Sequence, residues 1–136
     1  MHDRSLDVLR GLLVATIAIS VVHYTDNTIR WDVYTGGEDS LIPRWMVPVG
    51  WMIFTVAGIA GYVSYRDGRF SRSARWLSLC SVGGLVDPFH FATVSPSDFD
   101  AYQLVFIWGD FVVGGLGVLA FAVWVALSRA PREASA

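Results

Sequence analysis

The sequence predicts an all-α integral membrane protein, a bundle of four transmembrane helices with both chain termini in the cytoplasm. Hydrophobic residues make up 54% of the 136 residues and charged residues 16%, well to the apolar side of a soluble domain. The apolar residues gather in four runs, approximately 9–29, 44–65, 76–94 and 102–127. Each run has about the length that crosses a bilayer, so we expect a single membrane domain over residues 1–136.

The first run, 9–29, predicts a retained helix, because no small-x-small cleavage site of a secretory signal follows it. Its polar residues recur at the three- and four-residue steps of one helical face: Thr16, Ser20, His23, Asn27 and Arg30. Asn27 and Arg30 are best explained as a polar helix end that meets water. For the deeper His23, that explanation and an interior site are about equally supported.

The second run, 44–65, predicts a scaffold helix. It follows a polar, turn-rich segment, 32–42, with Gly36-Gly37 and the acids Glu38 and Asp39. Pro43 suits a first helical turn, where its missing N–H costs nothing. The stretch from Trp45 to Tyr65 carries no charge.

The third run, 76–94, contains the most unusual stretch of the chain. Asp87 and His90 stand three residues apart, so a helix would place both on one face. Pro88 between them lacks an N–H and favours a kink. Ionisable groups and broken backbone at membrane depth occur where protein or a water-filled cavity receives them. The stretch therefore predicts a polar site inside the bundle.

The fourth run, 102–127, is interrupted by a single charged residue, Asp110. Gln103, Asp110, Gly114 and Gly117 fall on one helical face. The glycines favour close helix packing over a cofactor slot. We expect the tail, 128–136, to be disordered.

Arginine supplies all ten basic residues, and their placement orients the bundle. They concentrate near the N-terminus, in the segment 66–75 and near the C-terminus, whereas acids dominate the other two loops. The positive-inside rule then predicts cytoplasmic termini in a multi-pass protein of the cell (plasma) membrane. The formal charge of −2 argues against a nucleic-acid partner. The lack of Lys excludes Schiff-base chemistry, and the single Cys80 excludes an internal disulfide.

Counting about 1.5 Å of rise per helical residue brings four ionisable groups to one layer in the outer half of the bilayer. Asp87 and Asp110 lie about 12 Å below the outer interface, His90 about 7 Å and His23 about 10 Å. Because a charged side chain facing lipid is costly, we expect these groups to point toward one another.

Four interpretations of this layer follow. His23, Asp26, Asp87, His90 and Asp110 could ligate a divalent metal such as zinc, iron or manganese. Asp87 and Asp110 could instead share a proton, with His90 as donor or relay, in acid–base catalysis on a small or lipophilic molecule or in a proton-coupled carrier. Haem b between His23 and His90 ranks lower, since it leaves the two aspartates unexplained. Finally, the charges could only specify packing, in an accessory subunit of a homo-oligomer or larger membrane complex.

Overall fold

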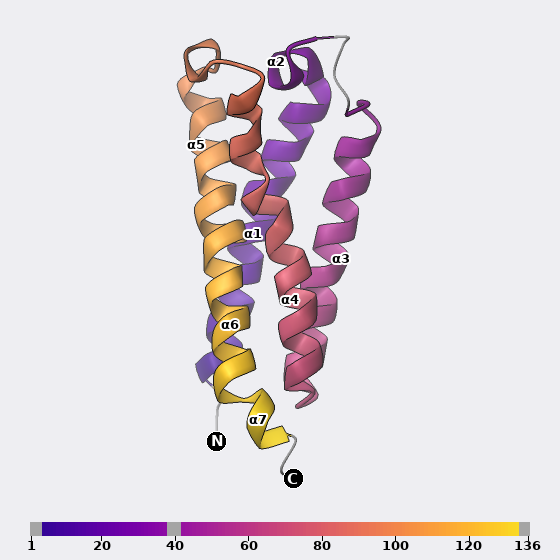
Figure 1. Ribbon diagram of the computed structural model, residues 1–136, viewed down its shortest axis with the longest axis vertical. Helices are drawn as coiled ribbons and strands as arrows, with labels where there is room; N and C mark the ends of the chain where they lie inside the picture. Colours follow the sequence, from indigo (N-terminus) through magenta and orange to yellow (C-terminus); the bar gives the residue numbers. More distant parts are fainter. Residues whose placement is uncertain (1–3, 38–41, 134–136) are drawn as a thin grey trace.

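The computed structural model describes residues 4–37 and 42–133, and within these ranges every regular element is a helix (Figure 1). In chain order the elements are α1 (Arg4–Ile29), α2 (Trp31–Thr35), α3 (Met46–Arg66), α4 (Phe70–Leu85), the 3₁₀-helices η1 (Asp87–Ala92) and η2 (Pro96–Asp98), α5 (Ala101–Gly109), the π-helix η3 (Asp110–Gly117), α6 (Val118–Ser128) and α7 (Ala130–Glu133). The acids Glu38 and Asp39 and residues 134–136 of the predicted disordered tail lie outside these ranges.

Four helical rods lie side by side, and both chain ends are at the same end of the molecule (Figure 1). The rods are α1, α3, α4 extended by η1, and the unbroken segment α5–η3–α6. Three helical segments are long and apolar enough to cross a membrane: Arg4–Ile29, Met46–Arg66 and Ala101–Ser128. The 16-residue α4 is too short to be counted with them.

The third rod differs most from the sequence prediction. Helix α4 begins at Phe70 rather than at Trp76, since the turn after α3 needs only the residues around Gly68, whose φ is +75°. Ser73 Oγ then donates to the carbonyl of Gly61 at 2.8 Å, which joins the start of α4 to α3. The α-helix ends at Leu85, and the chain continues as the 3₁₀-helix η1. The break precedes Pro88, which has no N–H to continue an α-helical ladder.

Two segments predicted to be irregular contain short helices. Residues Trp31–Thr35, inside the expected turn-rich segment, form α2, which ends at Gly36 in the left-handed conformation (φ 78°). Residues Ala130–Glu133 form α7, where the sequence predicts a disordered tail. Arg129, just before α7, places its guanidinium over the rings of Phe70 and Trp124. Side-chain contacts of this kind are not visible in hydropathy, and they support a short helix at the chain end.

The apolar core has two parts, with polar residues between them. One cluster lies toward the chain termini and is centred on Leu9, Leu77, Val118 and Val125. The other joins Tyr34, Val94, Phe99 and Ile107 at the opposite end. Between them are buried polar side chains from three of the rods: Thr16, Ser20, His23, Asn27, Asp87 and Asp110. Large aliphatic side chains such as Val14, Val56 and Val105 face outward and are more than half exposed, as a lipid-facing surface requires.

Glycines bring the third and fourth rods into backbone contact. A Cβ on Gly84 would collide with the carbonyl oxygen of Asp110 and the amide nitrogen of Gly115. A Cβ on Gly115 would lie 3.0 Å from the amide nitrogen of Leu85. This close approach is the packing role expected for small residues between membrane helices. It holds Asp110 directly beside the end of α4.

A candidate His/Asp metal centre

Helix α1 carries one side of the site on a single buried face. Its buried residues are Leu9, Leu13, Thr16, Ser20, His23 and Asn27, at steps of three and four. The predicted polar stripe is therefore an interior face over its first four members. Arg30, the fifth, keeps 47% of its side chain exposed and pairs with Asp26 and Asp100, as expected for a helix end at water. Asn27 is 5% exposed, so its assignment to a water-exposed helix end is wrong.

The 3₁₀-helix η1 carries the other side. With three residues per turn, a 3₁₀-helix places residues i and i+3 directly above one another. Asp87 and His90 therefore share a face, as their spacing predicts, and Asp87 is 2% exposed. Phe89, between them, is 72% exposed and points away from the bundle.

His23, Asp87 and His90 form a group that could hold a metal ion. Each offers one ligand atom, and these atoms all lie within 4.8 Å of one another. Nε2 of His23 is 3.5 Å from Oδ1 of Asp87. Two ligand atoms that are each about 2.1 Å from one tetrahedral ion are about 3.4 Å apart, so this separation already fits a shared ion.

The surroundings of His90 match those of a metal ligand. Its Nδ1 lies 3.2 Å from the backbone carbonyl oxygen of Tyr34, which can accept the proton on that nitrogen. Metal-ligating histidines usually donate their second ring N–H to a carbonyl or carboxylate in this way. Nε2 of His90 then carries the lone pair, and it lies 3.2 Å from Nδ2 of Asn27.

Several buried polar atoms of the site lack a hydrogen-bond partner among the described residues. The buried side-chain atoms in this condition are Nδ1 and Nε2 of His23, Oδ1 of Asn27, Oδ2 of Asp87, Oδ2 of Asp110 and, away from the site, the hydroxyl of Tyr65. Leaving one such group unpartnered costs about 1–3 kcal/mol. Their concentration at one place points to a ligand that satisfies several of them together.

Asp110 adjoins this group from the fourth rod. It is 2% exposed, and its carboxyl group is hydrogen-bonded to that of Asp87. Such a bond requires that one of the two carboxyl groups carries a proton. Asp110 begins the π-helix η3, an element that often occurs at functional sites. Its Oδ1 occupies the space that a side chain on Gly114 would fill.

Asp26, the remaining predicted ligand, lies outside the group of three. Oδ2 of Asp26 accepts hydrogen bonds from the Tyr34 hydroxyl at 2.8 Å and from Nε2 of Gln103 at 3.2 Å. Oδ1 of Asp26 lies 3.2 Å from Nε of Arg30. With its oxygens engaged in this way, Asp26 supports the end of the bundle above the site.

Tyr34 is a site residue that sequence reasoning missed, having placed it at the membrane interface. Its side chain is buried and lies against the rings of His23 and His90, at centroid distances of 5.6 and 5.0 Å. Burial, followed by the hydrogen bond to Asp26, raises the pKa of the Tyr34 hydroxyl, which therefore stays a neutral donor. The aromatic ring closes the site on the side of α2.

The haem interpretation does not fit this geometry. The rings of His23 and His90 contact each other edge to face, with centroids 5.8 Å apart. A haem ligated by two histidines needs its macrocycle between them, and these rings leave no space for one.

Comparison of the chain with protein families, with curated proteins and with solved structures finds no match, so the site stands on its own geometry.

Proposed function

We propose that this chain is a multi-pass membrane protein that holds one divalent transition-metal ion at His23, Asp87 and His90. The observation that carries the proposal is the concentration of unpartnered buried N and O atoms around these three side chains. Two imidazoles and one carboxylate form a ligand set used by zinc and by non-haem iron. Such a set leaves coordination positions open for water or substrate.

The amide of Asn27 supplies a candidate fourth ligand. A 180° turn of the amide exchanges Nδ2 and Oδ1, so an oxygen can occupy the position 3.2 Å from Nε2 of His90. That separation suits two ligands of one ion. Asn27 also stands one helical turn after His23 on the buried face of α1.

Charge supports a divalent ion. Asp87 and Asp110 are both buried, and no Arg contributes to the group. Two ionised carboxylates would leave two uncompensated negative charges in a low-dielectric interior, which is very unfavourable. One M²⁺ ion neutralises both.

Asp110 is the proposed acid–base residue. It touches the metal-ligating Asp87 without belonging to the ligand group, so it can take a proton from a molecule at an open coordination position. The metal would act as a Lewis acid toward that molecule. We infer a small or lipophilic substrate, because the site lies among helices with apolar outer faces.

A second candidate is metal-free acid–base or proton-transfer chemistry by Asp87 and Asp110. The hydrogen bond between the two carboxyl groups favours it, since a pair that shares a proton can both donate and accept. His23, with Nε2 3.5 Å from Asp87, would relay the proton.

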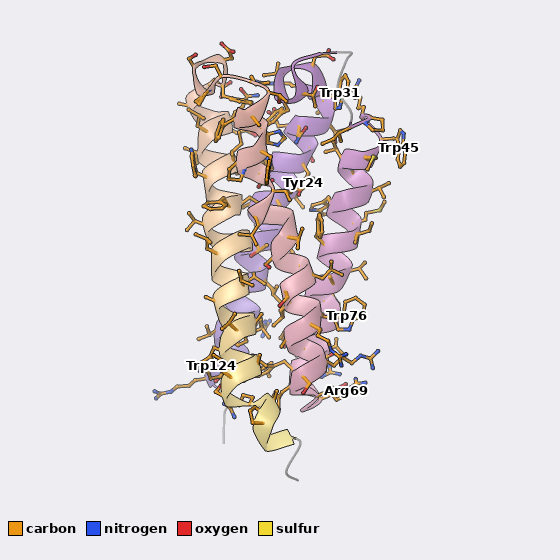
Figure 2. The ribbon with its side chains drawn as sticks, viewed as in Figure 1. Tyr24, Trp31, Trp45, Arg69, Trp76 and Trp124 are labelled. Atoms are coloured by element: carbon orange, nitrogen blue, oxygen red, sulfur yellow. The ribbon has the colours of Figure 1, made fainter. Side chains whose placement is uncertain are left out.

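We further propose that α4 and η1 together form a fourth pass, with both termini in the cytoplasm of the cell. In support, Figure 1 places both chain ends at one end of the bundle. Arg69 lies near that end together with Trp76 and Trp124, whereas Trp31 and Trp45 lie near the opposite end (Figure 2). Tryptophan at both ends and arginine at one suit a spanning bundle of this orientation.

Titration with Co²⁺ tests the metal centre and separates the two candidates. Purified protein should bind one Co²⁺ per chain and develop visible d–d bands of a low-symmetry N/O site, which Zn²⁺ then displaces. Replacing His23 or His90 by Ala should abolish the bands. Absence of any Co²⁺ or Zn²⁺ binding by the wild-type protein would eliminate the metal centre and leave the carboxyl pair as the functional unit.

A further inference from the structure

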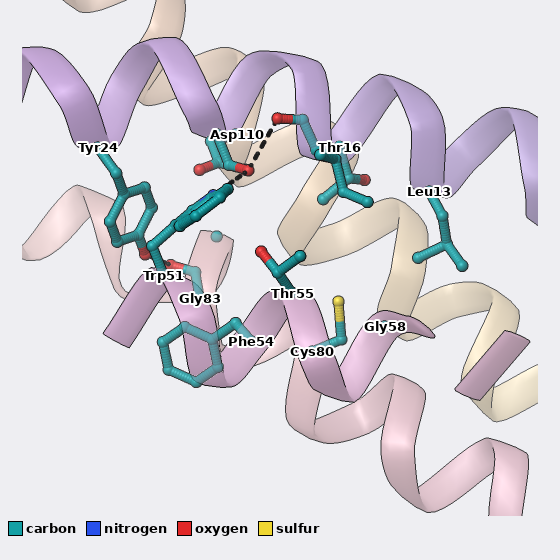
Figure 3. A pocket seen from close by; sticks show the side chains of 13 residues that line it. Leu13, Thr16, Tyr24, Trp51, Phe54, Thr55, Gly58, Cys80, Gly83 and Asp110 are labelled. Atoms are coloured by element: carbon teal, nitrogen blue, oxygen red, sulfur yellow. Dashed lines mark hydrogen bonds between the residues drawn. The ribbon is translucent and has the colours of Figure 1, made fainter. Parts of the chain in front are cut away.

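A pocket enclosed by α1, α3 and α4 lies against Asp110, on the side of the bundle where α3 packs (Figure 3). Most of its walls are apolar side chains and glycines, including Leu13, Ile17, Phe54, Gly58 and Gly83. Asp110 is the ionisable carboxyl group in this lining. The pocket therefore adjoins the proposed metal centre through one residue.

Most hydrogen-bond donors in the pocket wall are already used within the protein. Nε1 of Trp51 donates to Oγ of Ser20, and the Tyr24 hydroxyl donates to the carbonyl of Gly83. The hydroxyls of Thr16 and Ser20 donate to carbonyls of their own helix, those of Leu12 and Ile17. What the wall still offers a ligand is mainly acceptor lone pairs.

Asp110 provides the strongest of these acceptors. It is 2% exposed, and its Oδ2 receives no hydrogen bond from an N–H or hydroxyl group of the described residues. A carboxyl group has about four lone-pair sites, and the contact with Asp87 uses one of them. A molecule in this pocket is therefore recognised if it donates a hydrogen bond to Asp110.

The pocket continues toward the outer surface of the bundle. A groove between α1 and α3, lined by Val21, Thr28, Ile29 and Pro48, shares Tyr24 and Trp51 with it. Val21 and Ile29 are 41% and 66% exposed, on a face that we propose contacts lipid. An apolar chain attached to the donor group can lie in this groove.

We propose that the pocket binds a long-chain primary alcohol, with its hydroxyl donating to Asp110 and its chain lying between α1 and α3. The choice of an alcohol over an alkylammonium rests on the proposed metal centre. With M²⁺ bound, Asp87 and Asp110 already balance its charge, so a buried ammonium would be an uncompensated cation. A neutral hydroxyl satisfies Asp110 without adding charge.

Quenching of tryptophan fluorescence by brominated ligands tests this proposal, because Trp51 lines both the pocket and the groove. The Trp51→Phe variant defines the Trp51 component of the signal. An ω-bromo primary alcohol of about ten carbons should quench that component saturably, at about tenfold lower concentration than the bromoalkane of equal length. One hydrogen bond to a charged group accounts for such a factor.

Two variants of adjacent residues on α3 control the test. Thr55→Leu fills the pocket without touching Asp110 and should remove saturable quenching while the protein still binds Co²⁺. Val56→Leu, at a position 62% exposed, should quench like the wild type. Equal quenching by alcohol and alkane, or an unchanged Thr55→Leu variant, would overturn the pocket.

The matching ω-bromoalkylamine separates the pocket from the metal centre. In Co²⁺-loaded protein it should bind at least tenfold more weakly than the alcohol, and chelation should reduce that preference. Equal binding of amine and alcohol to loaded protein would refute the alcohol assignment. A wild type that binds no metal would refute the proposed function, whereas its preference for alcohol over alkane would still support or refute the pocket.

Discussion

Nδ2 of Asn27 lies 3.2 Å from Nε2 of His90, where α1 meets the 3₁₀-helix that follows α4. The contact joins two buried faces that are 63 residues apart in the chain. It also aligns the imidazole nitrogen that we propose as a ligand, while Nδ1 of the same ring faces the carbonyl of Tyr34. Asn27 thus connects the ligand-bearing face of α1 to His90.

Replacing Asn27 by Ala should weaken Co²⁺ or Zn²⁺ binding by about 10–100-fold, the usual effect of losing a group that orients a metal ligand. Asn27→Asp should retain or strengthen binding, because a carboxylate is a better ligand than an amide. Competition with a chromophoric chelator would measure both constants. Affinities equal to that of the wild type in both variants would show that Asn27 has no part in the metal centre.

Asp87 and Asp110 should behave as a coupled pair in unfolding experiments. Asp110→Leu removes the partner of a buried carboxyl group and should cost about 1–3 kcal/mol, whereas Asp110→Asn, which keeps a hydrogen-bonding amide, should cost less. The double variant Asp87→Asn/Asp110→Asn should deviate from additivity by about 0.5–3 kcal/mol in a double-mutant cycle. Reversible unfolding in mixed micelles is the measurement. Additive effects would place the two residues in separate environments.

Gly84→Ala should destabilise the bundle by about 1–3 kcal/mol, because the added methyl group meets the backbone of Asp110 and Gly115. Gly11→Ala is the matched control, at a helical glycine whose added Cβ meets nothing within 4 Å. The control should be neutral or stabilise by up to about 1 kcal/mol, since Ala favours helix over Gly. Equal melting temperatures for the two variants would contradict the close contact of the third and fourth rods.

Membrane orientation can be measured by thiol labelling in a Cys80→Ala background, which removes the single native cysteine. A cysteine at Ser71 should react only with reagent that reaches the cytoplasm, and one at Ser97 only with reagent outside the cell. Labelling of both positions from the same side would rule out a fourth pass through α4 and η1.

Hydropathy and periodicity predict much of this fold, because both report which helix faces avoid water. The stripe Thr16, Ser20, His23 and Asn27 is buried in the order that its spacing predicts. The three-residue step from Asp87 to His90 brings both to one face, although in a 3₁₀-helix rather than an α-helix. The sequence could not show that Asn27 is interior, because amphipathic helix ends have the same pattern.

The parts that the sequence does not predict depend on contacts between distant segments. Tyr34 covers the two histidines only because α2 turns back over the end of the bundle. The π-helix at Asp110–Gly117 permits a backbone contact with Gly84 that no local signal specifies. Asp26, chosen as a ligand from its position beside the stripe, is instead bonded by Tyr34 and Gln103. Side-chain partners of this kind are set by tertiary packing.

The most direct test of the metal centre is the metal content of the protein, measured by elemental mass spectrometry after purification without chelators and reconstitution with excess Zn²⁺. The wild type should retain one ion per chain after dialysis. His23→Ala, Asp87→Ala and His90→Ala should retain none, while Asp26→Asn, which changes a neighbouring carboxylate outside the group, should retain the ion. Less than a tenth of an ion per wild-type chain, or equal retention by wild type and His23→Ala, would contradict the metal centre.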